Sequence, residues 1–270
     1  FIEAVKEIAT LLGMDTDSLD SKGPPEKRMA KKVLNKAQLI YRKIAQSNQH
    51  EAFNQFVKDR QLRPETVQQF KIGLAPSQNA LSEYLKSIPQ KSDRELAIKM
   101  ALETRNIQKS TRPGSDYFDT FRERVIFPVW DQYGQVIGFC GRSLKDYQKA
   151  KYLNSSESLV FNKKNHLFGL NFAKQHIREK GFCLLVEGHM DLIALHQAGF
   201  ENSVAIMGIG LSDVALNLIK NLTHQFVLGL DNDSAGKNAM TRINGLCMDN
   251  GILPSVIDYS PYKDPDEFLV

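Results

Sequence analysis

The spacing of hydrophobic residues divides the chain into a helical first part, a β-rich middle and a last part in which strands alternate with helices. Helical spacing runs through residues 1–12 and about 24–59, with a turn-rich segment at 15–25 between them. Shorter helices are expected at 64–70, 79–87 and 92–105. Near residue 121 the spacing changes to that of strands. Runs at 125–130 and 136–143 flank the turn sequence DQYG, which predicts a β-hairpin.

The clearest pattern begins at residue 181. Apolar runs at 182–186, 203–207, 225–230 and 255–258 alternate with helical segments at about 189–199, 212–221 and 234–249, and another helix is expected at about 170–179. Strands that alternate with helices form right-handed βαβ units around a mainly parallel, covered sheet. We therefore predict an α+β amino-terminal part followed by an α/β module. The expected segments are 1–120 (basic and helical), 121–180 (basic and mixed) and 181–270 (α/β).

Composition excludes several classes of protein. Hydrophobic residues make up 42% of the 270 residues and charged residues 24%, as in globular proteins. No apolar run approaches the roughly 18 residues that span a bilayer, so we expect no membrane association. The three cysteines are odd in number and far apart, which argues against a disulfide framework or a zinc site and favours a cytoplasmic setting. The chain begins without Met or a signal peptide, which indicates a piece of a longer protein.

Charge is divided unevenly along the chain. Residues 1–180 contain 31 Lys and Arg against 20 Asp and Glu, whereas residues 181–270 contain 4 against 11. An excess of basic residues favours a polyanionic partner such as a nucleic acid. The acidic last third would repel that partner unless it binds cations that bridge to it. The charge pattern therefore predicts a basic binding surface next to an acidic, cation-binding one.

Carboxylates follow three of the predicted strands. In chain order they are Glu187, Asp191, Asp231, Asp233, Asp264, Asp266 and Glu267. The carboxyl ends of parallel strands meet at one edge of a sheet, so we expect these side chains to converge there. Two bare carboxylates about 5 Å apart repel by roughly 3 kcal/mol at an effective dielectric constant near 20, so protons or cations must neutralise them. We expect no protein cation among them, and oxygen ligands select Mg²⁺ or Mn²⁺.

Other motifs fit the same residues less well. The sequence DNDSAG begins like a calcium loop, but Ala235 replaces a ligand and Arg242 stands at the twelfth position, which excludes an EF-hand. The Gly-Lys pair at 236–237 lacks the spacing of a phosphate-binding loop. The glycines at 208–210 imitate a dinucleotide fingerprint, but Asp213 places a negative charge where pyrophosphate would bind.

Two further interpretations stay open at this point. An apolar strand followed by Asp-x-Asp is also typical of phosphatases that form an aspartyl phosphate, although Glu187 and the basic part then have no role. The acids could also be solvated loop residues and helix caps, with Asp233 as the N-cap of the following helix.

The acidic segment resembles a known module. LLVEGHMDLIALHQAGFENSVAIMG, VLGLDNDSAGKNA and KDPDEFL are similar to the Toprim module, which has a single Glu and an Asp-x-Asp. Toprim alone would equally fit topoisomerases, recombination-mediator proteins and nucleases. The basic stretches FNQFVKDRQLRPETVQQFKIGLAPS, RERVIFPVWDQYGQVIGFCGRSL and KYLNSSESLVFNKKNHLFGL make the whole chain similar to the RNA-polymerase core of bacterial DnaG-type primases. The chain departs from the family at Asn232 (usually Gly), His189 (commonly Tyr) and the turn at 208–212.

The resemblance implies a nucleotidyltransferase of DNA replication. It would join ribonucleoside triphosphates into short RNA primers on single-stranded DNA, with an RNA–DNA hybrid as product and two or more Mg²⁺ or Mn²⁺ ions. Glu187, Asp231 and Asp233 would be catalytic and would bind metal together with Asp264, Asp266 and Asp191, and Glu187 could instead act as a general base or acid. A Toprim nuclease and a non-catalytic Toprim nucleic-acid-binding module are the alternatives.

The resemblance also assigns the basic residues and the partners. Template and nucleotides would contact Arg60, Arg142, Lys151 and Lys163. Phe139, Tyr152 and Phe161 could stack on bases, but we expect them in the core. The family's zinc-binding domain would precede Phe1, so we expect no zinc in this chain. The domain that binds the replicative helicase would follow Val270.

Overall fold

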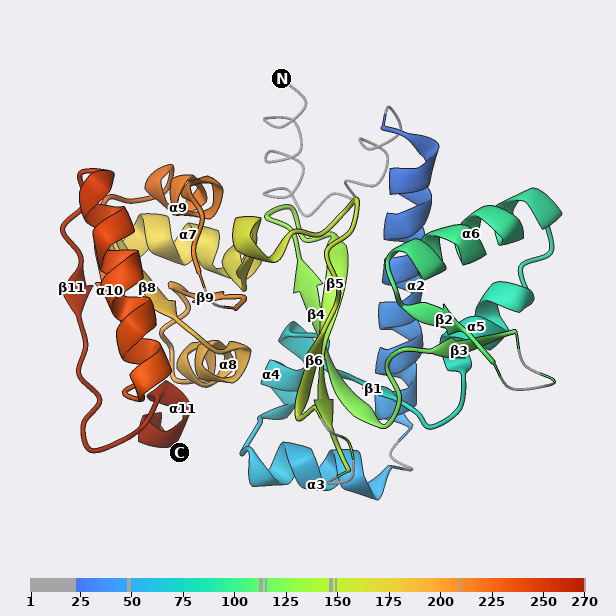
Figure 1. The fold of residues 1–270 in the computed structure, drawn as a ribbon. Helices are drawn as coiled ribbons and strands as arrows, with labels where there is room; N and C mark the ends of the chain where they lie inside the picture. The colour runs from blue at the N-terminus through green and yellow to red at the C-terminus, as the bar shows by residue number, and fades with distance from the viewer. Residues whose placement is uncertain are drawn as a thin grey trace. The chain divides into compact units, whose positions relative to one another are not determined.

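The computed structural model describes residues 23–47, 50–111, 114, 116–145, 148, 150–208 and 210–269. The chain divides into two compact units, which Figure 1 draws as ribbons. Unit 1 comprises residues up to Asp59 and Val67–Phe161, and unit 2 comprises Arg60–Thr66 and residues from Asn162 onward. The helix predicted for residues 1–12 lies outside the described residues.

Unit 1 contains the predicted helices and the β-hairpin. Its helices are α2 (Pro25–Gln46), α3 (Glu51–Asp59), α5 (Ala80–Lys86) and α6 (Lys91–Glu103), and α4 (Pro64–Gln69) crosses the boundary between the units. Its strands are β1 (Gly73–Ala75), β2 (Ile107–Lys109), β3 (Tyr117–Asp119), β4 (Arg124–Trp130), β5 (Val136–Ser143) and β6 (Tyr152–Asn154). The single helix predicted for about 24–59 is two helices, because α2 ends at Ser47, whose hydroxyl and N–H both donate to the carbonyl of Ile44.

The sheet of unit 1 is antiparallel in the order β1-β4-β5-β6, with α2 packed against it (Figure 1). The predicted hairpin is confirmed as β4 and β5. Its turn is closed by Asp131, whose carboxylate accepts hydrogen bonds from the N–H groups of Tyr133 and Gln135 at 2.9 and 3.0 Å. Every residue of β4 is buried, and Phe139 and Phe161 belong to the core, as expected. Tyr152 was also expected in the core but is only partly buried, because it lies on the edge strand β6.

Unit 2 has the predicted α/β order. Its helices are η2 (Lys163–Asn165), α7 (Leu170–Lys180), α8 (His189–Gln197), α9 (Asp213–Lys220), α10 (Ser234–Asp249) and α11 (Pro265–Leu269). Its strands are β7 (Leu167–Phe168), β8 (Cys183–Val186), β9 (Ser203–Ile206), β10 (Phe226–Leu228) and β11 (Ser255–Val256), in the sheet order β11-β10-β8-β9-β7. All neighbours are parallel except β7 and β9, which confirms the mainly parallel sheet.

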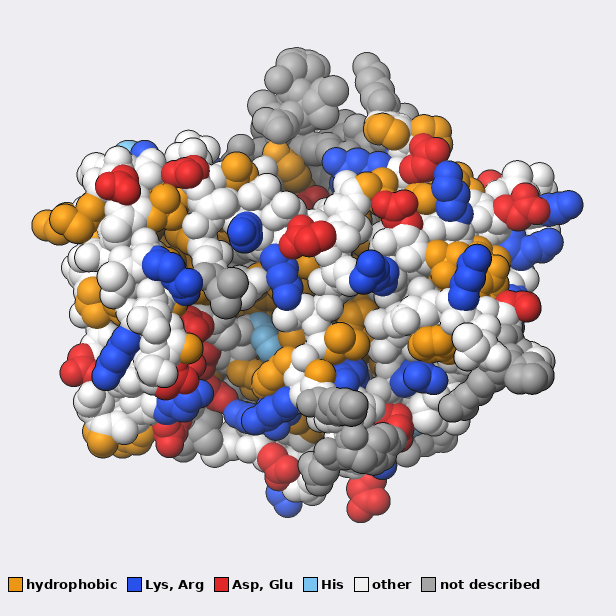
Figure 2. Space-filling view, viewed as in Figure 1, with side chains coloured by type: hydrophobic (Ala, Val, Ile, Leu, Met, Phe, Trp, Pro, Cys, Tyr) orange, Lys and Arg blue, Asp and Glu red, His pale blue; other side chains and the backbone are white. Residues whose placement is uncertain are grey.

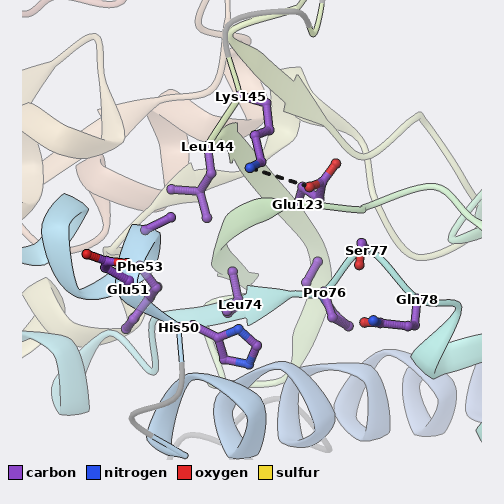
Figure 3. A pocket seen from close by; sticks show the side chains of 12 residues that line it. His50, Glu51, Phe53, Leu74, Pro76, Ser77, Gln78, Glu123, Leu144 and Lys145 are labelled. Atoms are coloured by element: carbon purple, nitrogen blue, oxygen red, sulfur yellow. Dashed lines mark ion pairs between the residues drawn. The ribbon is translucent and has the colours of Figure 1, made fainter.

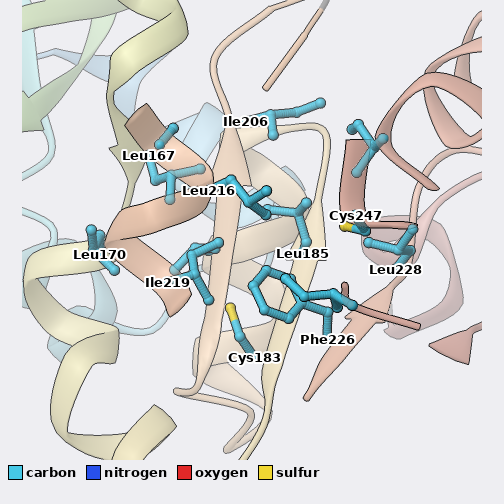
Figure 4. Packing of buried hydrophobic residues seen from close by; sticks show 14 of the residues in the cluster. Leu167, Leu170, Cys183, Leu185, Ile206, Leu216, Ile219, Phe226, Leu228 and Cys247 are labelled. Carbon is cyan, nitrogen blue, oxygen red and sulfur yellow. The ribbon is translucent and has the colours of Figure 1, made fainter. Parts of the chain in front are cut away.

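The core of unit 2 lies between this sheet and its helices (Figure 4). Residues from β8, β10 and the facing helices fill it, with Leu185, Leu216, Ile219 and Leu228 fully buried. Cys183 and Cys247 belong to the same cluster, and all three cysteines of the chain are buried and free of disulfides. Among the described residues, no helix is long and apolar enough to cross a membrane.

The three segments that we expected from the sequence do not coincide with the two units. Residues 121–180 contribute β4, β5 and β6 to unit 1, and η2, β7 and α7 to unit 2. The reason is that β7 pairs with β9, with Leu167 opposite Ile206, so the sheet of unit 2 gains its edge strand from before residue 181. Residues Arg60–Thr66 also belong to unit 2, where the side-chain oxygen of Gln197 accepts a hydrogen bond from the backbone N–H of Arg63.

Candidate functional site

Carboxylates gather at the carboxyl ends of the parallel strands of unit 2. Glu187 follows β8 directly, Asp231 and Asp233 lie just after β10, and Asp264 lies in the segment between β11 and α11. Charge interactions link these side chains to one another, since Asp231 and Asp233 both raise the pKa of Glu187. We call Glu187, Asp231, Asp233 and Asp264 the acidic rim. Figure 2 shows acidic side chains gathered on the surface of unit 2, with basic side chains next to them.

A lysine lies among these carboxylates, and our expectation of a rim without a protein cation is therefore wrong. The ammonium nitrogen of Lys263 is 3.6 Å from a carboxylate oxygen of Asp231 and 3.6 Å from one of Asp264. An oxygen of Asp233 is 3.9 Å away. Although burial opposes its charge, the three carboxylates raise the pKa of Lys263, so it is cationic at neutral pH.

One lysine does not compensate all of the negative charge. Burial, followed by repulsion from Asp231 and Asp233, raises the pKa of Glu187 to about 7. Burial, followed by repulsion from Asp231 and Asp264, also raises the pKa of Asp191 to about 7. The pKa of Asp231 is raised as well, mainly by burial, against the opposing effect of Lys263. Near neutral pH Glu187 and Asp191 therefore either hold protons or need a further cation nearby.

The donor atoms fit a hard divalent cation. Oε1 of Glu187 and Oδ1 of Asp231 are buried and have no hydrogen-bond partner, which is costly for carboxylate oxygens unless a cation binds them. Within the described part of the chain, no three carboxylate, imidazole or thiolate groups are already gathered as a metal site. Three acids of the rim, Asp231, Asp233 and Asp264, lie within 4 Å of Lys263 instead. An all-oxygen set of this kind suits Mg²⁺ or Mn²⁺.

Helix α10 fixes the Asp231–Asp233 loop. Asp233 is the N-cap of α10, and its Oδ1 accepts hydrogen bonds from the N–H groups of Ala235 and Gly236, both at 2.9 Å. Asp233 is therefore the helix N-cap that the sequence analysis kept as an alternative. Its other oxygen, Oδ2, faces Lys263. A Cβ atom at Gly236 would lie 2.1 Å from the carbonyl oxygen of Asp231, so only glycine allows the loop to pass this close to the helix.

Two of the predicted metal ligands have structural partners. The carboxylate of Asp191 accepts hydrogen bonds from the backbone N–H of Gly188 at 3.0 Å and of Asp266 at 3.3 Å, so each of its two oxygens binds a backbone N–H group. Asp266 pairs with Arg60, with 2.5 Å between Oδ2 and Nη1. Arg60 was expected to contact nucleic acid, and in this structure it neutralises Asp266. Asp191 and Asp266 thus tie α8, α11 and Arg60 together next to the acidic rim.

The other predicted basic residues are distributed over both units. In unit 1, the guanidinium of Arg142 lies 5.3 Å from the ring centre of Phe56 and 5.4 Å from that of Tyr152, and it donates to the Tyr152 hydroxyl at 2.7 Å. Lys151 is exposed beside Tyr152. In unit 2, Lys163 begins the turn η2, which Ser212 holds through a hydrogen bond from its hydroxyl to the carbonyl of Lys164 at 2.8 Å.

Unit 1 also contains a cavity of about 350 Å³ that the sequence did not indicate (Figure 3). Phe53, Leu74 and Leu144 give it apolar walls, and its edge carries an ion pair of 3.9 Å between Lys145 and Glu123. Its lining comes from α3, β1 and the loops after β1, before β4 and after β5. None of the site residues predicted from the sequence lines it.

The sequence also gave no role to two residues at the acidic rim. Lys263 is one, and Asn232 is the other, because its backbone N–H donates to the carbonyl of Lys263 at 2.7 Å and its amide donates to the carbonyl of Tyr262 at 2.9 Å. The one signal in the sequence was that Lys263 directly precedes the acids of the segment KDPDE. Nothing in the linear sequence shows that the two loops meet.

Sequence comparison finds two family models along the chain. The model described as "DNA primase catalytic core, N-terminal domain" matches residues 40–174, and a Toprim-like model matches residues 184–269. The DNA primase of Aquifex aeolicus (strain VF5) is 35% identical over 269 residues, which are 100% of this chain and 51% of that protein. The DNA primase of Lactococcus lactis is 32% identical over 274 residues, which are 99% of this chain and 41% of that protein. The chain thus spans about half the length of the curated relatives it matches or less.

Solved structures agree with the sequence comparison. The zinc-binding and RNA polymerase domains of the Aquifex aeolicus primase match with a TM-score of 0.80 and 34% identity, over 98% of this chain and 62% of that one. A DnaG primase catalytic domain bound to single-stranded DNA matches with a TM-score of 0.78 and 28% identity, over 89% of this chain and 74% of that one. Together with the Glu and Asp-x-Asp at the strand ends of unit 2, these matches show that the chain belongs to the family of DnaG-type DNA primases.

Proposed function

We propose that this chain is the catalytic core of a DNA primase, which joins ribonucleoside triphosphates into an RNA primer on a single-stranded DNA template. The observation that carries the proposal is the acidic rim, in which buried oxygens of Glu187 and Asp231 have no hydrogen-bond partner. Mg²⁺ or Mn²⁺, when bound there, would neutralise the rim and stabilise the charge that develops during nucleotidyl transfer. A solved structure of a DnaG primase catalytic domain bound to single-stranded DNA supports the template as partner.

The residues of the rim have different parts in this proposal. Glu187, Asp231 and Asp233 would hold the metal ions, with Asp264 beside them. Asp233 stays in place through its hydrogen bonds to the start of α10, and one of its oxygens remains available. Asp191 and Asp266 would instead keep the neighbouring loops in place. Asp191 accepts two backbone hydrogen bonds, and Asp266 pairs with Arg60. With a pKa of about 7, Glu187 could also accept or deliver a proton at neutral pH.

Basic and aromatic side chains would hold the nucleic acid and the nucleotides. The guanidinium of Arg142 lies over the rings of Phe56 and Tyr152 and donates to the Tyr152 hydroxyl, so we propose that it is pre-organised to donate to a phosphate group. Lys151 is exposed on the same unit, and Lys163 lies on η2 of unit 2. We propose that these three residues neutralise phosphates of the template or of the incoming triphosphate.

Incubation with single-stranded DNA, ribonucleotides and Mn²⁺ or Mg²⁺ tests the proposal. Labelled products that grow support a primase, whereas shortening of the DNA would indicate a Toprim nuclease, and unchanged substrates would indicate a module that only binds. Adding an annealed RNA primer in a parallel reaction separates elongation from initiation. In either reaction the product must depend on ribonucleotides and on the metal.

Asp231→Asn is the informative variant, and Asp249→Asn is its matched control. Asp231 contributes an unpartnered buried oxygen to the rim, so we expect synthesis to fall by at least about a hundredfold when its charge is removed. Asp249 is exposed at the end of α10, and its replacement should leave synthesis unchanged. Primer extension on a gel measures synthesis by both variants. Full activity of Asp231→Asn would overturn the assignment of the acidic rim as the catalytic site.

A further inference from the structure

Lys263 is held in its position by the loop that carries the aspartates. The backbone N–H of Asn232 donates to the carbonyl of Lys263 at 2.7 Å, and the Asn232 amide donates to the carbonyl of Tyr262 at 2.9 Å. From the other side, the N–H of Lys263 donates to a carboxylate oxygen of Glu267 at 2.7 Å. Three hydrogen bonds therefore fix the backbone at residues 262–263, and with it the direction from which the lysine enters the acidic rim.

The ammonium group of Lys263 lies where a cation would bind. It is within 4 Å of carboxylate oxygens of three rim acids, on the loops after β10 and β11. At these distances the positive charge of Lys263 attracts each of the three carboxylates, and because the lysine side chain is 56% exposed, water weakens that attraction. The rim thus has an internal counter-charge even when no ion is bound.

A divalent cation that binds the same carboxylates would have to displace this ammonium. Lys263 contacts Oδ2 of Asp231 and of Asp233, whereas the unpartnered oxygen of Asp231 is Oδ1. An ion held by these carboxylates would therefore lie next to the ammonium, and the two positive charges would repel each other. The lysine side chain has four rotatable bonds, and 56% of it is exposed, so it can turn to solvent without unfolding the loop.

We propose that Lys263 is a built-in competitor for the metal, which holds the acidic rim together in the metal-free protein and lowers the affinity of the rim for a divalent cation. Asn232 assists by fixing the loop that carries the lysine. This inference rests on the proposed metal-binding function of the rim. It concerns how tightly this chain binds the ion and how stable the chain is without it.

Mn²⁺ binding to the purified chain tests the proposal without any measurement of activity. Mn²⁺ affinity is measured by isothermal titration calorimetry, and free Mn²⁺ by electron paramagnetic resonance, for the unchanged chain and for Lys263→Met. Methionine keeps an unbranched, flexible side chain that is one atom shorter, and removes the charge. We expect Lys263→Met to bind Mn²⁺ at least about tenfold more tightly and to melt at a lower temperature in EDTA.

Two further variants separate charge from structure. Lys263→Arg keeps the positive charge, so its Mn²⁺ affinity should stay close to that of the unchanged chain. Lys237→Met removes a lysine from α10 whose charge acts on Asp258, which is not a rim acid, and it should leave Mn²⁺ affinity unchanged. Asn232→Gly removes the bond to Tyr262 and should tighten Mn²⁺ binding by a smaller factor than Lys263→Met.

The outcomes distinguish the two proposals. Equal or weaker Mn²⁺ binding by Lys263→Met, with clear binding by the unchanged chain, would overturn the role of Lys263 and leave the metal site standing. Absence of Mn²⁺ binding by both would overturn the metal site and the competitor together. If Lys263→Met does not fold, Asn232→Gly gives the same decision, because tighter binding supports competition and weaker binding shows a purely structural role.

Discussion

At the scale of single residues, the surroundings of each carboxyl group in unit 2 decide which charge it carries. Asp233 accepts two N–H groups at the start of α10, and these bonds, that of Gly236 first, lower its pKa. Glu187 and Asp191 are shielded from water and face other acids, so their pKa values rise to about 7. The acidic rim and the neighbouring Asp191 therefore combine an acid whose charged form is favoured, Asp233, with two acids that exchange protons near neutral pH, which suits a site that gains and loses cations.

These raised pKa values predict how stability depends on pH. The folded chain keeps protons on Glu187 and Asp191 that the unfolded chain releases above its ordinary values of 4.5 and 3.8. Their stabilising contribution is present in full below those values and is lost as the pH rises through about 7. We expect the melting temperature in EDTA to fall between pH about 6 and about 8, and Mg²⁺ to restore it more at the higher pH.

Calorimetry at several pH values measures this effect, and a double variant serves as its control. Glu187→Gln with Asp191→Asn removes both titrating groups, so the loss of stability between pH about 6 and about 8 should become smaller. An equally steep loss in the double variant would assign the pH dependence to other groups.

Arg142 allows charge and shape to be tested separately. The side chain lies by two aromatic rings and bonds to the Tyr152 hydroxyl, so a phosphate would meet a guanidinium that is already oriented. We expect Arg142→Glu to weaken binding of single-stranded DNA by at least about tenfold, and Arg142→Lys to weaken it by less. Fluorescence anisotropy with a labelled oligonucleotide measures both.

The same charge reversal on unit 2 is the control for Arg142. Arg242 is exposed on α10, so Arg242→Glu changes the net charge by the same amount without touching the aromatic pair. Equal loss of binding in Arg142→Glu and Arg242→Glu would show that only the total charge of the chain matters.

At the scale of elements, the start of α10 determines where the aspartates stand. Gly236→Ala would place a Cβ 2.1 Å from the carbonyl of Asp231, so the Asp231–Asp233 loop must move. We expect this variant to lose stability by about 1–3 kcal/mol and to lose most of the stabilisation by Mg²⁺. Gly245→Ala, on the same helix with open space around the added methyl, should instead stabilise by about 0.5–1 kcal/mol. Chemical denaturation with and without Mg²⁺ distinguishes the two; similar behaviour of both variants would contradict this account.

The same elements show what could be predicted from the sequence. Strands β8, β9 and β10 and helices α8, α9 and α10 follow local spacing and lie within two residues of the expected bounds. The position of β7 was missed because two residues carry no periodic signal, and its pairing with β9 is a long-range contact. Lys263 was missed for a similar reason, since only the meeting of Asn232 with residues 262–263 brings its ammonium to the acids.

At the scale of the whole molecule, the division of charge along the chain should separate template binding from metal binding. The excess of Lys and Arg lies in residues 1–180 and the excess of acids in residues 181–270, where the rim and Lys263 are. Phosphates would release counterions at the basic residues, so binding of single-stranded DNA should weaken with salt. Metal ions would act at the rim, so variants of the rim should leave that salt dependence unchanged.

The slope of DNA affinity against salt measures this division. Each phosphate neutralised on a single strand contributes a slope of about −0.7 in a plot of log affinity against log salt. If Arg142, Lys151 and Lys163 each neutralise one phosphate, we expect a slope of about −2 between about 50 and about 300 mM KCl in EDTA. Arg142→Ala should reduce its magnitude by about 0.7, because one contact is lost. Asp231→Asn should leave the slope unchanged, because its carboxylate pairs with Lys263 and is expected to hold metal ions, which EDTA removes. A slope near zero would mean that these residues do not bind phosphates. The same change of slope in Arg142→Ala and Asp231→Asn would mean that the acidic rim takes part in holding the DNA.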